Sequence, residues 1–297
     1  MAETFLTLTN RVLGRLNEVQ LTSTSFSTAR GIQVRAQNAV NEAVRYINQK
    51  EFQYPFNHST KTETLVPGTV RYTIPTTAKT VDYNTFRLVK DSDLGSSGGR
   101  LYIINYNDYV NSYITQEDEI QTTTTSTTHT DSVTTITVAS TTGFDSTGTL
   151  FIANEQITYT GTTSTTFTGC TRGANDTTAA SIASGVQVAQ FENGGVPQYV
   201  ARTPDNNFLL YPFPTKAFSL KYDFFSFPTD MSASTDTTTV PDRFAAVIID
   251  GATAFVYQYR GETTQYQLNM DRFEYIRSTF IPKTGYTSTA DLSIRVN

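Results

Sequence analysis

The sequence predicts an α+β protein, with a helical bundle built from both chain termini and β-structure between them. Apolar residues repeat at helical spacing near both ends, alternate with polar residues in between, and give way to a Thr- and Ser-rich stretch in the middle. The predicted parts are N-terminal bundle helices at 1–57, an antiparallel β-barrel or β-sandwich at 58–121 and 191–235, a small all-β insert at 122–190, C-terminal bundle helices at 236–281 and a C-terminal arm at 282–297.

Two apolar stripes predict the N-terminal helices. Phe5, Leu8, Val12 and Leu16 share one face of a helix over about residues 3–17. A second helix is expected to reach about residue 52, with either Ser27 or Thr28 as its N-cap. Alanines along its apolar face allow close approach, so this helix should pack against another helix. Those face residues are Ile32, Ala36, Ala39, Val40, Ala43 and Ile47.

The host β region is predicted from alternation of apolar and polar residues over 61–114, and from the aromatic run at 208–227. Pro67 and Gly68 mark a turn between two short strands. The host β region contains more aromatic side chains than one face of a small sheet can bury. They are therefore either buried on two sides within the subunit or available for subunit contacts, where Tyr and Phe are enriched. The aromatic side chains in question are Tyr102, Tyr106, Tyr109, Tyr113, Tyr211, Phe213, Tyr222, Phe224, Phe225 and Phe227.

The insert at 122–190 begins with a Thr/Ser run at 122–130 that has the composition of a linker. Short strands are expected at 134–138, 149–153, 156–160 and 165–168, with Gly and Asn residues at the turns. The insert's expected interior is small and consists of Val133, Ile136, Val138, Phe144, Leu150, Ile152, Ile157, Tyr159, Phe167 and Val188.

The C-terminal helices are bounded by clear signals. Pro241 and Asp242 open a third helix, and Gly261 ends it. Its apolar surface is wider than one face, which indicates burial on two sides. A fourth helix is expected over about 263–280, closed by Pro282. That helix presents Tyr266, Met270, Phe273, Ile276 and Phe280 on one face.

Composition limits the classes of function. The net charge is −5, and a dedicated nucleic-acid-binding protein normally has a basic surface instead. Cys170 is the one cysteine of the sequence, so no internal disulfide is possible, and we expect it to be a small buried apolar residue. The N-terminal residues lack the basic and apolar regions of a signal peptide. No stretch has the 18 or so apolar residues of a membrane span, so no membrane partner is expected.

Catalytic chemistry is weakly represented, and we expect no catalytic, cofactor-binding or metal-binding residues. His58 and His129 are the two histidines of the sequence, and neither has a His or Cys at metal-ligand spacing. The Gly-rich turn at 95–99 lacks the Gly-Lys-Ser/Thr ending of a phosphate loop. Acidic residues at 117–119 are better explained as a solvated turn than as a cation site. Asp223 and Asp230 could imitate a glycosidase pair, but the chain has no Trp to stack on a sugar.

A resemblance to a known family rests on the order of these elements and on the motifs NFLLYPFP, SLKYDFFSFPTDM and VPDRFAAVIIDGATAFVYQY. The pattern resembles the head-to-tail adaptor proteins of short-tailed double-stranded DNA bacteriophages, the group that includes T7-type tail tubular protein A. It covers roughly 1–120 and 195–280, and segment 133–188 resembles a small β module of many phage structural proteins. The most family-like residues are Pro212, Pro214, Pro228, Pro241, Asp242, Gly251 and Ala252.

The resemblance implies a structural virion protein of the tail or neck, assembled in the host cytoplasm. It implies a homo-oligomeric, dodecameric ring between the portal protein and the tail nozzle protein, lining a channel through which genomic DNA passes without specific binding. Tail fibres are a further candidate partner. The residues expected at interfaces are Phe244, Ile248, Phe255, Tyr259, Tyr211, Phe213, Phe225, Tyr286, Leu292 and Ile294.

Two alternatives come from other classes of function. The Thr-rich insert could make the chain a peripheral tail adhesin or a fibre-attachment module. A tail-associated hydrolase is a third possibility, disfavoured by the scarcity of catalytic groups.

Overall fold

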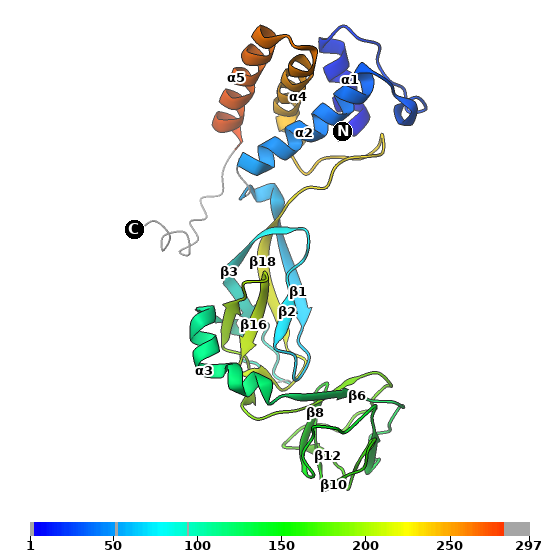
Figure 1. The fold of residues 1–297 in the computed structure, drawn as a ribbon, viewed down its shortest axis with the longest axis vertical. Coiled ribbons are helices and arrows are strands. Elements are labelled where there is room, and N and C mark those ends of the chain that lie inside the picture. The colour runs from blue at the N-terminus through cyan, green and yellow to red at the C-terminus, as the bar shows by residue number, and fades with distance from the viewer. Residues whose placement is uncertain (1–2, 51–52, 94, 282–297) are drawn as a thin grey trace. The chain divides into compact units, whose positions relative to one another are not determined.

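The protein is described by a computed structural model that covers residues 3–50, 53–93 and 95–281. It contains helices and several sheets, which confirms the α+β class (Figure 1). The described residues group into two compact units. A helical unit comprises residues up to 59, together with 76–80 and 224–281, and a β unit comprises 60–75 and 81–223.

Four α-helices form the helical unit: α1 (Phe5–Arg15), α2 (Ile32–Lys50), α4 (Ala245–Arg260) and α5 (Thr263–Phe280). The hydroxyl of Thr4 accepts the Thr7 N–H at 3.2 Å and caps α1. The one-turn 3-10 helices η1 (Phe26–Thr28), η2 (Pro55–Asn57) and η3 (Asp242–Phe244) precede α2, β1 and α4. The left-handed φ of +75° at Gly261 ends α4, as the sequence predicts.

The expected start of the second helix is wrong. Ser27 and Thr28 lie in η1, and α2 begins at Ile32. Ala29 is extended and Gly31 has a φ of +56°, so the chain leaves helical geometry between the 3-10 turn and α2.

One hydrophobic core joins the four helices, and α4 contributes to it with both of its sides (Figure 1). Ile248 and Ala252 are completely buried in this core. Gly251 permits the close crossing of α4 and α5, because a Cβ there would lie 2.9 Å from the ring of Phe273. Most of the wide apolar surface of α4 is therefore buried within the subunit, and Tyr259 near its C-terminal end stays exposed.

Two four-stranded sheets form the host part of the β unit. One has the order β1 (His58–Thr64), β18 (Ser219–Ser226), β3 (Ala78–Leu88), β4 (Gly99–Arg100). The other has the order β2 (Arg71–Thr73), β16 (Asn207–Tyr211), β15 (Tyr199–Arg202), β5 (Tyr102–Ile104), with β5 parallel to β15. A short parallel pair joins β14 (Gly194–Gly195) and β17 (Phe213–Pro214). Each four-stranded sheet ends in two edge strands, so the described strands do not form a closed barrel.

Aromatic rings from both sheets share the interior of the host β region. The ring of Phe86 on β3 stacks on Tyr222 at 4.6 Å and meets Phe208 on β16 edge-on at 5.0 Å. The ring of Tyr72 on β2 stacks on the ring of Phe208, with centroids 5.5 Å apart. These contacts place the two sheets against each other and account for much of the aromatic excess in the sequence.

The prediction of strand structure up to residue 114 is wrong over its last part. Residues Tyr106–Asp118 form helix α3, which follows Asn105 in extended conformation. The tyrosines at 106, 109 and 113 fit helical spacing as well as a strand. Tyr109 is buried, and the ring of Tyr113 stacks at 3.8 Å on Tyr211 of β16. Packing on the sheet therefore selects the helix.

Segment 122–190, here called the Thr-rich module, has a hydrophobic core of its own. Its five-stranded sheet has the order β12 (Thr171–Ala174), β9 (Glu155–Tyr159), β8 (Gly148–Ile152), β13 (Gln187–Gln190), β6 (Gln121–Thr124). A second sheet has the order β10 (Gly161–Thr162), β11 (Thr166–Thr168), β7 (Thr135–Thr137). All ten residues of the expected interior lie in or against this core, and Cys170 is buried in it as expected.

The entry and exit of the Thr-rich module are paired strands. Thr124 of β6 lies opposite Gln187 of β13 in an antiparallel ladder. The expected linker at 122–130 is therefore wrong at its start, because a run of Thr residues also suits a pleated strand. Ala189 of β13 and Phe151 of β8 pack in a hydrophobic cluster with Val70 and Phe213 of the host β region.

Candidate assembly surfaces

The residues considered for catalysis or metal binding have structural contacts instead. The ring of His58 lies edge-on to Phe225 at 5.7 Å. His129 is buried, with Nε2 at 3.2 Å from both the backbone N and O of Thr137. Within the described ranges, no group of three or more His, Cys, Asp or Glu side chains is placed to hold a metal ion. In the same part of the chain, no helix has the length and apolar character required to cross a bilayer.

Three of the acidic residues singled out in the sequence, Glu117, Asp223 and Asp230, contact cations or hydroxyls. Glu117 accepts hydrogen bonds from Arg71 at 2.7 Å and from Tyr109 at 3.0 Å. Asp223 accepts one from Thr60 at 2.7 Å and lies 3.4 Å from Arg87. The hydrogen bonds from Arg45 hold the pKa of Asp230 below its ordinary value. These carboxylates stabilise the local fold.

Asp118 and Glu119 remain exposed and line a groove of the β unit. This groove has a volume of about 750 Å³ and is also lined by Asp145 and Glu192. Gln190, which also lines the groove, donates a hydrogen bond to Asp145 at 2.9 Å. The groove is polar and acidic, and it is not a set of metal ligands.

The residues predicted at interfaces lie in different environments. Phe244, Ile248, Phe213 and Phe225 are buried within the subunit. Phe255 and Tyr211 are half-buried, and Tyr259 is 60% exposed at the C-terminal end of α4. The predictions for Tyr286, Leu292 and Ile294 concern positions outside the described residues. Among the predicted residues that the structure describes, Tyr259 has the most surface available to a partner. The interface roles of the others stay predictions.

Two exposed apolar residues on α5 were not singled out from the sequence. Leu268 and Tyr275 are each 66% exposed and lie seven residues apart, so they share one face. That face is opposite Phe273, which is buried against α4. A helical projection of 263–280 would have revealed this second face, because only the stripe through Phe273 can point into the core.

A buried carboxylate connects three helices of the helical unit. The side chain of Asp250 on α4 is fully buried and pairs with Arg15 of α1. Its Oδ2 has no well-aligned hydrogen bond, yet Nε of Arg272 on α5 lies 3.2 Å away. We regard that contact as an ion pair, because charge attraction depends on distance more than on alignment. Asp250 thus holds α1 and α5 against α4.

A second polar contact joins α2 to α5. The Tyr46 hydroxyl donates to Glu274, which also accepts from Arg277 at 2.7 Å. Burial, followed by the hydrogen bond to Glu274, raises the pKa of Tyr46 to about 12. The charged residues Arg272, Glu274 and Arg277 of α5 therefore serve contacts within the subunit.

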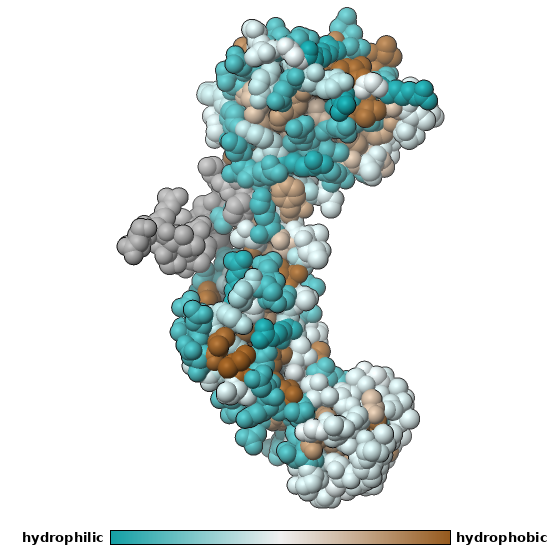
Figure 2. All heavy atoms as spheres, viewed as in Figure 1, coloured by the Kyte–Doolittle hydropathy of each residue, from teal (hydrophilic) through white to brown (hydrophobic). Residues whose placement is uncertain are grey.

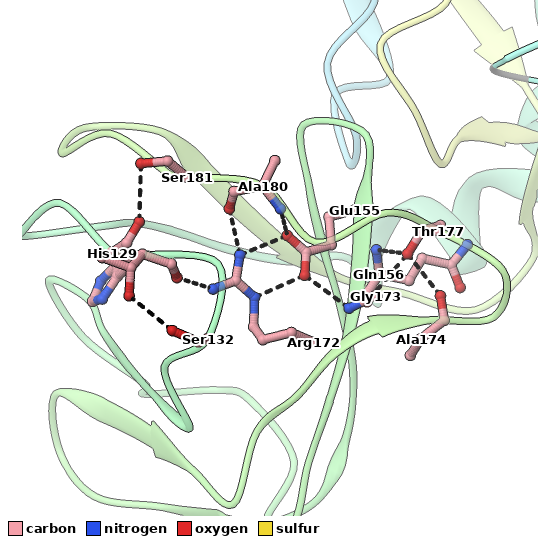
Figure 3. Close-up of polar contacts among 11 residues, drawn as sticks. His129, Ser132, Glu155, Gln156, Arg172, Gly173, Ala174, Thr177, Ala180 and Ser181 are labelled. Atoms are coloured by element: carbon pink, nitrogen blue, oxygen red, sulfur yellow. Dashed lines mark hydrogen bonds and ion pairs between the residues drawn. The ribbon is translucent and has the colours of Figure 1, made fainter.

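The Thr-rich module contains a buried ion pair between Glu155 and Arg172, whose side chains are 3% and 6% exposed. Figure 3 shows the two side chains facing each other. Nε and Nη2 of Arg172 donate to Oε1 and Oε2 of Glu155, each at 2.7 Å. The carboxylate also accepts the N–H groups of Gly173 at 2.9 Å and Ala180 at 3.2 Å. The guanidinium donates to the carbonyls of Thr130 and Ala180. Every charged atom of the pair is thus satisfied within the module.

This pair predicts a pH dependence for the module. Burial alone would raise the pKa of Glu155, but the hydrogen bonds from Arg172, Gly173 and Ala180 outweigh it, so the pKa lies below the ordinary value of 4.5. A carboxyl with a lowered folded-state pKa contributes stability that is complete above about pH 4.5 and is lost as the pH falls through the folded-state pKa. Amide hydrogen exchange of module peptides should therefore accelerate below pH 4.5, after correction for intrinsic rates.

A variant with Glu155→Gln is the control for that pH dependence, because it lacks the titrating carboxyl. Equal acid sensitivity in the variant and the wild type would assign the effect to other groups.

The surface of the module differs from that of the helical unit. Figure 2 shows it as an almost uniformly pale surface, in agreement with its Thr and Ser content, whereas strongly hydrophilic and hydrophobic residues mix on the helices. Neutral hydroxyls on strand faces suit the pleated structure.

The polar and charged groups described above hold the protein's own elements together. Large exposed apolar side chains lie on α4 and α5, and also on strand β5 at Tyr102 and Ile103. Residues 108–279 match the model of the SU10 adaptor protein family. The match covers more than half of the chain and extends from α3 through the Thr-rich module to α5, so the chain belongs to this family. The protein is accordingly a phage structural adaptor and a virion component. No curated protein was found to match the chain.

Proposed function

We propose that this adaptor forms a ring between the portal protein and the tail nozzle of a short-tailed phage, with a central channel for genomic DNA. Membership of the SU10 adaptor protein family carries the proposal, because a phage adaptor joins virion components. The four-helix bundle of the helical unit serves as the ring-forming part. A dodecamer is the proposed state.

The charge of the chain supports a channel that DNA passes without being held. A net charge of −5 per subunit repels a polyanion, and the repulsion is repeated around a ring. Tight phosphate binding would require a basic surface that releases counterions.

The Thr-rich module is proposed to lie at the periphery of the ring, where it can contact tail fibres. Its own core and its paired entry and exit strands support this role, since such a segment can be added to a host fold at adjacent positions of the chain. Phe151 and Ala189 anchor the module to a hydrophobic cluster of the host. The proposed contact of the C-terminal arm with the portal concerns residues outside the described ranges.

The test is assembly on purified portal rings, followed by negative-stain imaging and native mass spectrometry. The wild-type chain should add a ring of subunits to the portal. A variant in which Gly-Gly replaces residues 125–186, between Thr124 and Gln187, should still dock, because their antiparallel pairing can be closed by a two-residue turn. A wild-type chain that stays monomeric and leaves portal rings bare would refute the proposed function.

A further inference from the structure

The outer face of α5 lacks a partner within the described part of the subunit. It consists of Leu268, Asp271 and Tyr275, which lie at spacings of three and four residues; we call this the α5 face. Leu268 and Tyr275 are the two largest exposed apolar groups of this helix. Asp271 is exposed and has no ionic partner among the described side chains. The neighbouring charged residues of α5 form ion pairs within the subunit: Arg272 with Asp250, and Arg277 with Glu274.

A groove on another face of the helical unit has complementary properties. It lies between α2 and α4, has a volume of about 220 Å³, and is lined by Arg35, Ala39, Phe255 and Tyr259, among others; we call this the α2–α4 groove. The small side chain of Ala39 permits close approach, and Phe255 and Tyr259 provide aromatic surface. The Arg35 guanidinium lies over the Tyr259 ring, 4.5 Å from its centroid, and has no carboxylate partner within the described residues.

We propose that the α5 face of one subunit binds the α2–α4 groove of a neighbouring copy of this chain. In this contact Asp271 pairs with Arg35 of the neighbour, and Leu268 and Tyr275 bury their side chains against the groove. Each face supplies the charge that the other lacks within its own subunit. The occupant is therefore a second copy rather than an unrelated partner.

The dimensions of the two faces agree. Leu268 and Tyr275 are seven residues apart, which at 1.5 Å per residue is about 10 Å along the helix. The α2 wall of the groove, from Arg35 to Glu42, also spans seven residues and has the same length. Two turns of α5 can therefore lie along two turns of α2. Aromatic residues and arginine, which this contact brings together, are enriched at the cores of protein–protein interfaces.

The contact uses two different patches of one subunit and is thus heterologous. Heterologous contacts generate rings when the rotation closes and filaments when it does not. Both patches belong to the helical unit, so the contact does not depend on the β unit. This inference rests on the proposed ring and names the surfaces that form it.

Charge reversal provides the test, with assembly on portal rings as the measurement. Asp271→Arg and Arg35→Asp each place like charges opposite each other, so each variant alone should assemble at least roughly tenfold less well than wild type. A one-to-one mixture of the two variants should assemble again, because an alternating ring pairs Arg at 271 with Asp at 35 and retains the native pair at every other contact. The chain carrying both substitutions should assemble as well.

Asp131→Arg, which makes the same charge change at an exposed site in the Thr-rich module, is the matched control and should assemble normally. Circular dichroism melting of each variant separates loss of folding from loss of contact. Wild-type rings together with normal assembly of both single variants would overturn this interface and leave the ring itself standing. Loss of assembly in both single variants without rescue in the mixture would also overturn the proposed pairing. Absence of wild-type rings would refute the proposed function.

Discussion

Arg172→Ala is expected to destabilise the Thr-rich module by about 3–5 kcal/mol, because it leaves the buried Glu155 carboxylate without its cation. The substitution also leaves the carbonyls of Thr130 and Ala180 without a donor. Hydrogen-exchange mass spectrometry is the appropriate measurement, since it reports opening of module peptides separately from the rest of the chain. Exchange over 133–188 should become faster, and exchange in α4 should not change.

Two further variants separate charge from packing in that result. Replacing both partners, Glu155→Leu with Arg172→Leu, removes both buried charges and should cost less than Arg172→Ala alone. Arg30→Ala removes an exposed arginine and should leave module exchange unaltered. If Arg172→Ala left the exchange of the module unchanged, the ion pair would have no role in its stability.

The double substitution Arg15→Ala with Arg272→Ala is expected to destabilise the helical unit by about 3–5 kcal/mol. Both cations that face Asp250 are then removed, and a fully buried carboxylate has no charged partner. Unfolding in urea, followed by circular dichroism of the helices, should show a lower midpoint. The single variants should have smaller effects, because one cation remains in each.

Adding Asp250→Leu to that double variant is the decisive control. If the loss comes from a stranded buried charge, replacing the carboxylate with an apolar side chain should recover most of the stability. A triple variant that is less stable than the double variant would show that Asp250 contributes through packing rather than charge.

The sequence alone determined the elements whose signals are local. Gly261 ends α4 as expected, and α5 has the predicted limits, because capping and periodicity act over one or two turns. The expected start of the third helix is displaced: Pro241 and Asp242 open the 3-10 turn η3, and α4 itself begins at Ala245. The strands and interior of the Thr-rich module were also predictable, since alternation with Gly turns defines both. The adaptor class was suggested by the order of these elements, and the family match supports it independently.

Only the tertiary structure decided which polar and apolar side chains have partners. Arg15 and Asp250 are 235 residues apart, so no local pattern could pair them. Helix α3 depends on the packing of Tyr113 against Tyr211 of a distant strand. The apolar residues of α4 and α5 were visible in the sequence, but the sequence did not say which of them are covered. In the fold, Ile248 is buried within the subunit, whereas Leu268 and Tyr275 are exposed. Periodicity reports that a face is apolar, whereas burial depends on which other element covers it.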